Sequence, residues 1–177
     1  TAGVGMPDLG GWVGFSATDS AWVEQTQRYA REVVSVSPPE WRGIRSSARE
    51  MFDNRYYITD AVTTASAMYY CRLFQAAGIR KLIINGFPLS HQHLVERIRR
   101  DAPEIAIYAL WHGSFLQSGE DVAWKGFQTL LSYARNGYIE KLGFVKEGMA
   151  EILAKQGLRT AFVMNMVQRI PSMPANV

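Results

Sequence analysis

Residues 135–153 read Arg-Asn-Gly-Tyr-Ile-Glu-Lys-Leu-Gly-Phe-Val-Lys-Glu-Gly-Met-Ala-Glu-Ile-Leu, and residues 156–165 read Gln-Gly-Leu-Arg-Thr-Ala-Phe-Val-Met-Asn. This order predicts a short strand, a loop that ends in Lys146-Glu147-Gly148, an amphipathic helix, and a buried strand that stops at Asn165. A strand, a helix and a second strand in succession form the unit of a parallel sheet. The stretch therefore predicts an α/β fold.

The same alternation extends through the rest of the sequence. Further strands are predicted at residues 12–16, 33–36, 55–58, 81–85 and 105–111. Helices are predicted from Asp19 or Ser20, near residues 44–52, from Asp60 to Ala76, from Ser90, and around Trp124 to Ala134. Ser90 is a candidate N-cap for the helix that follows it. Gly78 suits the left-handed backbone at the end of the helix predicted from Asp60 to Ala76. Together these elements predict an open, mostly parallel, Rossmann-like sheet with helices on both faces.

Composition narrows the class of protein. The chain has 177 residues, 47% hydrophobic and 20% charged, which suits one folded domain and argues against global disorder. No apolar run approaches the roughly 18 residues of a membrane span. The single Cys71 excludes an internal disulfide, and the net charge of +3 does not favour nucleic acid as a partner.

Candidate site residues follow three of the predicted strands. In parallel sheets, ligands bind at the carboxyl ends of the strands, where glycine lets the backbone approach a ligand. The candidates are Asn85 and Gly86 for substrate binding, His112 for catalysis, Gly113 and Ser114 for substrate binding, and Lys146 and Glu147 at a helix start that can receive an anion. For each residue the alternative is structural, as a loop hydrogen bond, a turn or a solvated helix start.

Several kinds of site are not supported by the sequence. His91 and His93 are two residues apart and face different sides of a helix, so no metal site is predicted. Cys71 is expected to be a packing residue. The chain also lacks the glycine fingerprint of dinucleotide-binding proteins, the phosphate-loop motif and the Gly-Xaa-Ser-Xaa-Gly elbow of hydrolases. We therefore expect no cofactor.

One family resemblance spans roughly residues 80–170. A strand followed by His112-Gly113 and a helix, then Ile139-Glu-Lys-Leu-Gly-Phe-Val-Lys-Glu-Gly-Met-Ala and a strand that closes on Asn165, resembles the N-terminal, acceptor-side half of GT-B glycosyltransferases. The likeness is greatest to the retaining group that uses nucleotide-sugar donors. The chain departs from that pattern in its first eighty residues, which lack the usual glycine-rich loop after the first strand.

The resemblance implies a division of the protein into two domains. Residues 1–170 would be one Rossmann-like domain, residues 171–177 would begin an interdomain linker, and the second domain, which binds the nucleotide sugar, would be absent. His112 and Lys146-Glu147 would face the cleft between the domains. The implied function is that of the acceptor-binding half of a hexosyltransferase. This half would be inactive alone, and the enzyme would need no metal. Its partners would be an acceptor sugar or a lipid-linked acceptor, in the cytoplasm or in peripheral contact with a membrane.

Two other classes of protein remain open. The first is a non-catalytic, ligand-sensing or receiver-like α/β module, although a receiver would carry aspartates where Ser16, Asn85 and His112 stand. The second is a small-molecule enzyme such as a methyltransferase, although no glycine-rich loop with a following acidic residue is evident after the first strand.

Overall fold

The computed structural model describes residues 14–114, 119 and 121–165, and it confirms the predicted α/β class. Six parallel strands form one sheet in the order β2-β1-β3-β4-β5-β6. The strands are β1 (Val33–Ser37), β2 (Arg55–Tyr57), β3 (Lys81–Asn85), β4 (Ala106–Trp111), β5 (Lys141–Phe144) and β6 (Thr160–Phe162). Because all of them are parallel, their carboxyl ends meet at one edge of the sheet.

Helix α1 (Ala17–Arg28) precedes β1, and the other helices connect the strands. These are α2 (Arg42–Met51), α3 (Thr64–Ala76), the short 3-10 helix η1 (Leu89–His91), α4 (Gln92–Asp101), α5 (Asp121–Arg135) and α6 (Glu147–Lys155). Within the described ranges, no helix has both the length and the apolar character needed to cross a bilayer.

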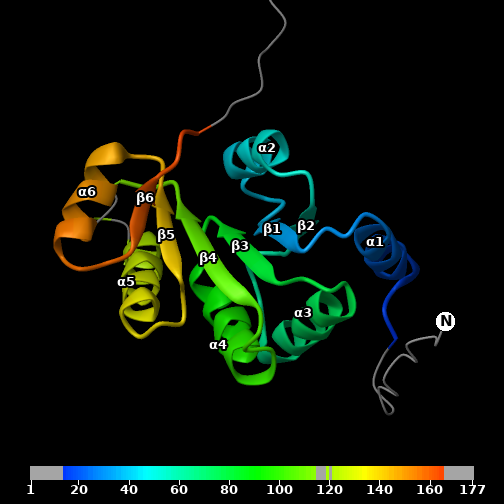
Figure 1. The fold of residues 1–177 in the computed structure, drawn as a ribbon. Coiled ribbons are helices and arrows are strands. Elements are labelled where there is room, and N and C mark those ends of the chain that lie inside the picture. Colours follow the sequence, from blue (N-terminus) through cyan, green and yellow to red (C-terminus); the bar gives the residue numbers. More distant parts are fainter. Residues whose placement is uncertain (1–13, 115–118, 120, 166–177) are drawn as a thin grey trace, which may run out of the picture.

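The direction of the connections separates α2 from the later helices. From β1 the chain moves outward through α2 to β2, and it then returns past β1 and adds β3 to β6 on the other side. Since crossovers between parallel strands are right-handed, this reversal puts α2 on the opposite face from α3, α4, α5 and α6. Figure 1 shows α2 set apart from α3, α4 and α5, which lie together along the strands.

The core lies on one face of the central strands. Leu82 and Ile84 of β3, Ile107 of β4, and Leu142 and Phe144 of β5 are fully buried. The residues between them, such as Ile83 and Tyr108, are half-buried. This period of two is the alternation of a pleated strand, and it orients the polar residues at the strand ends.

The start of the described chain differs from the prediction. Residues 14–16 of the predicted strand 12–16 are not a strand, and residues 12 and 13 lie outside the described part. Ser16 instead caps α1, because its hydroxyl oxygen accepts a hydrogen bond from the Asp19 N–H at 3.1 Å. The Asp19 carboxylate in turn accepts from the Tyr56 hydroxyl at 2.6 Å and from the Tyr69 hydroxyl. These bonds fasten α1 to β2 and α3.

Two further expectations are corrected. Ser90 does not cap α4, because it lies inside η1, where its hydroxyl donates to the Asp60 carbonyl at 2.5 Å and accepts from the Val62 N–H at 3.0 Å. The strand that leads to Asn165 is also not buried. It is the edge strand β6, whose Phe162 is 45% exposed. By contrast, Gly78 has the predicted left-handed backbone, with φ of +74°.

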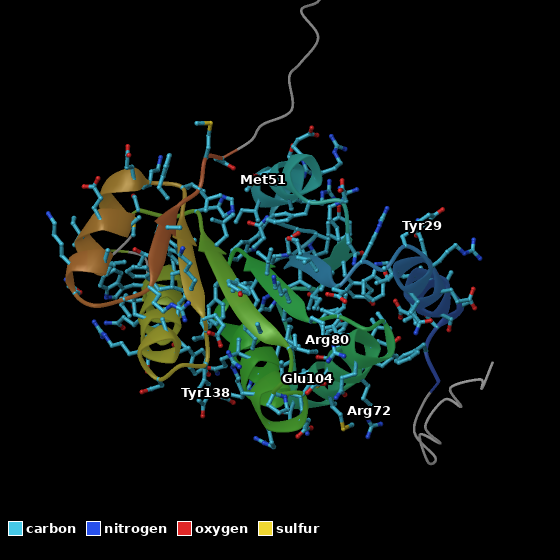
Figure 2. The ribbon with its side chains drawn as sticks, in the orientation of Figure 1. Tyr29, Met51, Arg72, Arg80, Glu104 and Tyr138 are labelled. Carbon is cyan, nitrogen blue, oxygen red and sulfur yellow. The ribbon has the colours of Figure 1, made fainter. Side chains whose placement is uncertain are left out.

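The chain after β6 reaches α2 at the carboxyl edge of the sheet. The Ser47 hydroxyl, which is fully buried on α2, donates a hydrogen bond to the side-chain oxygen of Asn165. In Figure 2 Met51, the last residue of α2, lies at this edge, and Glu104 and Tyr138 lie toward the opposite one. The predicted linker, residues 171–177, lies outside the described residues.

Candidate functional site

The candidate site is a cavity of about 600 Å³ at the carboxyl edge of the sheet. It lies where the strand order reverses, beside the ends of β3 and β4, which is where open parallel sheets bind their ligands. The residues that line it are Trp41, Ile44, Asp60, Gly86, Phe87, Pro88, Leu89, Ser90, Trp111, His112, Gly113 and Ala123. Three of the predicted site residues, Gly86, His112 and Gly113, are therefore among them.

Gly86 directly follows β3 and lines the cavity, and it lets α2 pack closely against the end of this strand. Its φ is +77°, a conformation that side chains other than glycine rarely adopt. A Cβ atom there would lie 2.8 Å from Ile44 Cδ1 and 3.1 Å from the Trp41 ring. The absence of a side chain at Gly86 thus allows Trp41 and Ile44 to form one wall of the cavity.

Asn85 and His112 are brought together from neighbouring strands. Asn85 is the fully buried last residue of β3, and His112 follows the last residue of β4. His112 Nε2 lies 2.5 Å from Asn85 Oδ1. Because an amide oxygen can only accept, His112 Nε2 carries the proton and donates it. The ring therefore keeps an unprotonated Nδ1, which can accept a hydrogen bond.

Burial fixes the charge state of His112. Removal from water disfavours the charged imidazolium and lowers the pKa of His112 to about 4. At neutral pH the side chain is therefore uncharged, with one donor used by Asn85 and one acceptor left. This arrangement favours contact with a ligand hydroxyl over contact with an anion.

Two buried hydrogen-bond donors, one of them in Asn85 itself, have no partner among the described residues. They are Asn85 Nδ2 and the indole Nε1 of Trp111. A buried N–H without a partner costs free energy, so such groups are usually satisfied by water or by a ligand. Trp111 lines the cavity, whereas its N–H group is itself inaccessible to solvent.

The loop from Thr59 to Val62 forms another part of the cavity wall. The two hydrogen bonds of Ser90 hold this loop against η1 and bring Asp60 to the cavity. His91 strengthens the same contact between the loop and η1, since its Nε2–H donates a hydrogen bond to the Thr59 carbonyl at 3.1 Å. His91 is fully buried, and this burial lowers its pKa to about 4 despite the hydrogen bond to Thr59. His91 is thus a structural residue behind the wall.

The other predicted site residues are not part of the cavity wall. Lys146 and Glu147 are exposed at the start of α6. They share the strand-end edge with His112, because β4 and β5 are neighbouring parallel strands. Ser114 is half-buried beside Gly113 but does not line the cavity. The substrate-binding role expected for these three residues stays a prediction.

Sequence reasoning missed Trp41, Ile44 and Asp60. Trp41 follows Pro38-Pro39 in the segment with the weakest pattern, and its position depends on a contact with Gly86, a residue distant in the chain. One signal was available, because Pro38-Pro39 marks a turn after the predicted strand 33–36, and ligands bind beyond strand ends. Asp60 gave a similar signal, because it lies two residues after the predicted strand 55–58.

Charge is sparse in the cavity. Of its described lining residues only Asp60 and His112 are ionisable, and none is lysine or arginine. The part of the chain that the structure describes also contains no group of three His, Cys, Asp or Glu side chains that could hold a metal ion. The surroundings therefore suit an uncharged ligand with hydroxyl groups and apolar surface.

Comparison with protein-family models, with curated proteins and with solved structures gives no match for this chain.

Proposed function

We propose that this chain is the acceptor-binding part of a GT-B glycosyltransferase of the retaining type, which moves a sugar from a nucleotide sugar to a hydroxyl group. The observation that carries the proposal is the neutral His112, held by Asn85 at a cavity where the strand order reverses. Its free Nδ1 is suited to accept a hydrogen bond from the hydroxyl of an acceptor.

The composition of the cavity wall supports a sugar as the ligand, and we call this cavity the sugar cavity. Trp41, Phe87 and Trp111 supply aromatic surface, which packs against the apolar faces of sugar rings. Asp60 and His112 supply acceptors for hydroxyl hydrogens. A few polar groups in an otherwise apolar cavity give orientation and specificity.

In the proposed reaction the acceptor oxygen bonds to the anomeric carbon of the donor sugar. The bond between that carbon and the phosphate oxygen of the nucleotide breaks, and the acceptor loses its hydroxyl proton. With a pKa of about 4, His112 is a weak base at neutral pH, so we assign it to orienting the hydroxyl. Groups that bind the nucleotide would come from a second domain, and we expect this chain alone to be inactive.

The proposal places the protein in the cytoplasm or at a membrane surface. Its partners there are an acceptor sugar or a lipid-linked acceptor, and nucleic acid is not among them. Lys146 and Glu147, on the same edge as the sugar cavity, would face the second domain.

Titration of a panel of mono- and disaccharides into the protein, followed by calorimetry or by amide NMR shifts, tests the proposal. We expect saturable binding that weakens at least about tenfold in His112→Ala, since the proposed hydrogen bond between the ligand hydroxyl and Nδ1 is lost. The control is His93→Ala, which removes a half-buried histidine from α4. Equal affinity in the two variants would remove His112 from the site. Failure of every saccharide to bind would count against the function as a whole.

A second candidate is a non-catalytic ligand-sensing module. The low pKa of His112 favours it, because a sensor needs a hydrogen-bond acceptor and no base. Reading the gene past the codon for Val177 distinguishes the two functions. A second α/β domain with a donor-binding motif would favour the transferase, and a stop codon would favour the sensor.

A further inference from the structure

The outer face of α2 carries a cluster of three arginines. Arg42, Arg45 and Arg49 are spaced three and four residues apart, which puts them on one side of the helix. All three are exposed. Together with Ser46 and Tyr57 they line a hollow of about 290 Å³. This hollow, which we call the arginine hollow, is separate from the sugar cavity in its lining residues.

Arg42 stands at a position that disfavours positive charge. Arg42 is in the first turn of α2, which contains no acidic residue, and the amino end of a helix carries partial positive charge. Neighbouring like charges at spacings of three and four residues also repel. The helix forms nonetheless because its inner face is covered, with Ser47 and Ala48 buried.

The charges of Arg42 and Arg45 are not neutralised by the described protein. Neither guanidinium forms an ion pair or a hydrogen bond with any residue in the described ranges. Arg49 is different, because its Nε lies 3.6 Å from a carboxylate oxygen of Glu50. The arginine hollow therefore has at least two guanidinium groups whose donors are available to a ligand.

We propose that the arginine hollow binds a phosphate group of a small molecule, such as a phosphate monoester or a pyrophosphate. The planar fork of arginine matches two phosphate oxygens at once, and such charge-assisted pairs are the strong ones. Ser46 and Tyr57 add hydroxyl groups to the wall. A bound dianion offsets both the repulsion among the arginines and the unfavourable position of Arg42.

The surface of α2 argues against two other anionic partners. A helix that lies on a membrane inserts large apolar side chains, whereas the exposed residues of α2 are Arg42, Gly43, Arg45, Arg49 and Glu50. Nucleic acid needs a row of phosphate contacts along a face, and here Glu50 adds a negative charge beside the cluster. A single small phosphate fits the arginine hollow better.

This inference does not depend on the proposed glycosyl transfer. Nevertheless, α2 connects the two places, since Trp41 and Ile44 line the sugar cavity and Arg42, Arg45 and Arg49 line the arginine hollow. The sugar cavity has no described cation, so a phosphate in solution has no comparable site there.

Titration of sodium pyrophosphate into the protein at low ionic strength, followed by calorimetry, tests the proposal. We expect saturable binding that falls at least about tenfold in an Arg42→Gln/Arg45→Gln double variant, because each guanidinium supplies a charge-assisted bond. The matched control is Arg80→Gln/Arg100→Gln, which removes two exposed arginines elsewhere and gives the same net charge. The control is expected to bind like the wild type.

Three results would overturn the proposal. They are no saturable binding by the wild type, equal weakening in both double variants, and binding to vesicles of anionic phospholipid without binding of pyrophosphate. Should the Arg42→Gln/Arg45→Gln protein fail to fold, amide NMR shifts of the wild type decide instead. Shifts confined to residues 42–49 and 57 would support the arginine hollow, and shifts elsewhere would refute it.

Discussion

Asn85 Oδ1 and His112 Nε2 lie 2.5 Å apart, although the two residues are 27 positions apart in the chain. The contact arises because β3 and β4 are adjacent and parallel, so that their last residues meet at one edge. Asn85 is fully buried and cannot turn to solvent. The hydrogen bond thus sets the orientation of the imidazole ring and decides which of its nitrogens carries the proton.

Replacing Asn85 by alanine should weaken acceptor binding. The Nε2–H group of His112 loses its acceptor, so the ring is free to change orientation and proton position. We expect saccharide affinity to fall about tenfold, and the free energy of unfolding in urea to fall by about 1–3 kcal/mol for the unsatisfied donor. Asn54→Ala, which removes another buried amide near β2, is the control. It should destabilise the protein without changing affinity, and a similar loss of affinity in both variants would contradict the prediction.

Asn85→Asp should raise the pKa of His112. A carboxylate at hydrogen-bond distance favours the charged imidazolium and opposes the effect of burial, which now holds the pKa at about 4. An NMR titration of the imidazole Cε1–H signal against pH measures this directly. We expect the midpoint to move upward by at least one pH unit, and an unchanged midpoint would mean that residue 85 does not contact the ring in solution.

The stability of the protein should decrease in mild acid. The pKa values of His91 and His112 are lowered from 6.5 to about 4 in the folded protein, so between these values the unfolded chain binds more protons. Stability is therefore fully present above about pH 6.5 and is lost as the pH falls toward 4. Each histidine contributes a slope of up to about 1.4 kcal/mol per pH unit.

Urea unfolding at several pH values checks this slope. His91→Gln and His112→Gln should each reduce the dependence on pH, and the double variant should remove most of it. A wild-type protein of constant stability between pH 6.5 and 4 would show that neither ring is kept from water.

Gly86→Ala should destabilise the protein more than Gly137→Ala. Both glycines have positive φ, +77° and +73°, so the backbone strain of about 1–2 kcal/mol is shared. Only at Gly86 would the new methyl group collide with Ile44 and Trp41, whereas nothing lies within 4 Å at Gly137. We expect an additional loss of about 1–3 kcal/mol from this crowding, measured by urea unfolding.

A double-mutant cycle separates crowding from strain. Shortening Ile44 to alanine gives the methyl group room, so Ile44→Ala should cost less in the Gly86→Ala background than in the wild type. Additive effects would show that α2 does not pack on Gly86.

The regular elements were predictable because their signals are local. Residues 81–85 form a short apolar run that becomes β3 with the expected ends, and Gly78 ends its helix as expected. Ser16 misled the prediction because the apolar residues before it imitate a strand, whereas its hydroxyl caps α1. The prediction for Ser90 was also wrong, because its hydroxyl forms a hydrogen bond with the Asp60 carbonyl and does not cap α4.

The site was predictable in part for the same reason. Asn85 ends β3, and Gly86, His112 and Gly113 directly follow strands. Parallel strands bring their ends together whatever the intervening sequence. The wall formed by Trp41 and Asp60 depends on loops that are placed by contacts with residues distant in the chain. No spacing within the sequence encodes those contacts.

The hydrogen bond from Ser47 to Asn165 has a structural consequence. The helix that walls the sugar cavity is tied through this bond to the chain that leaves β6. Trp41 and Ile44 are therefore joined, through α2 and one side-chain contact, to the far edge of the sheet.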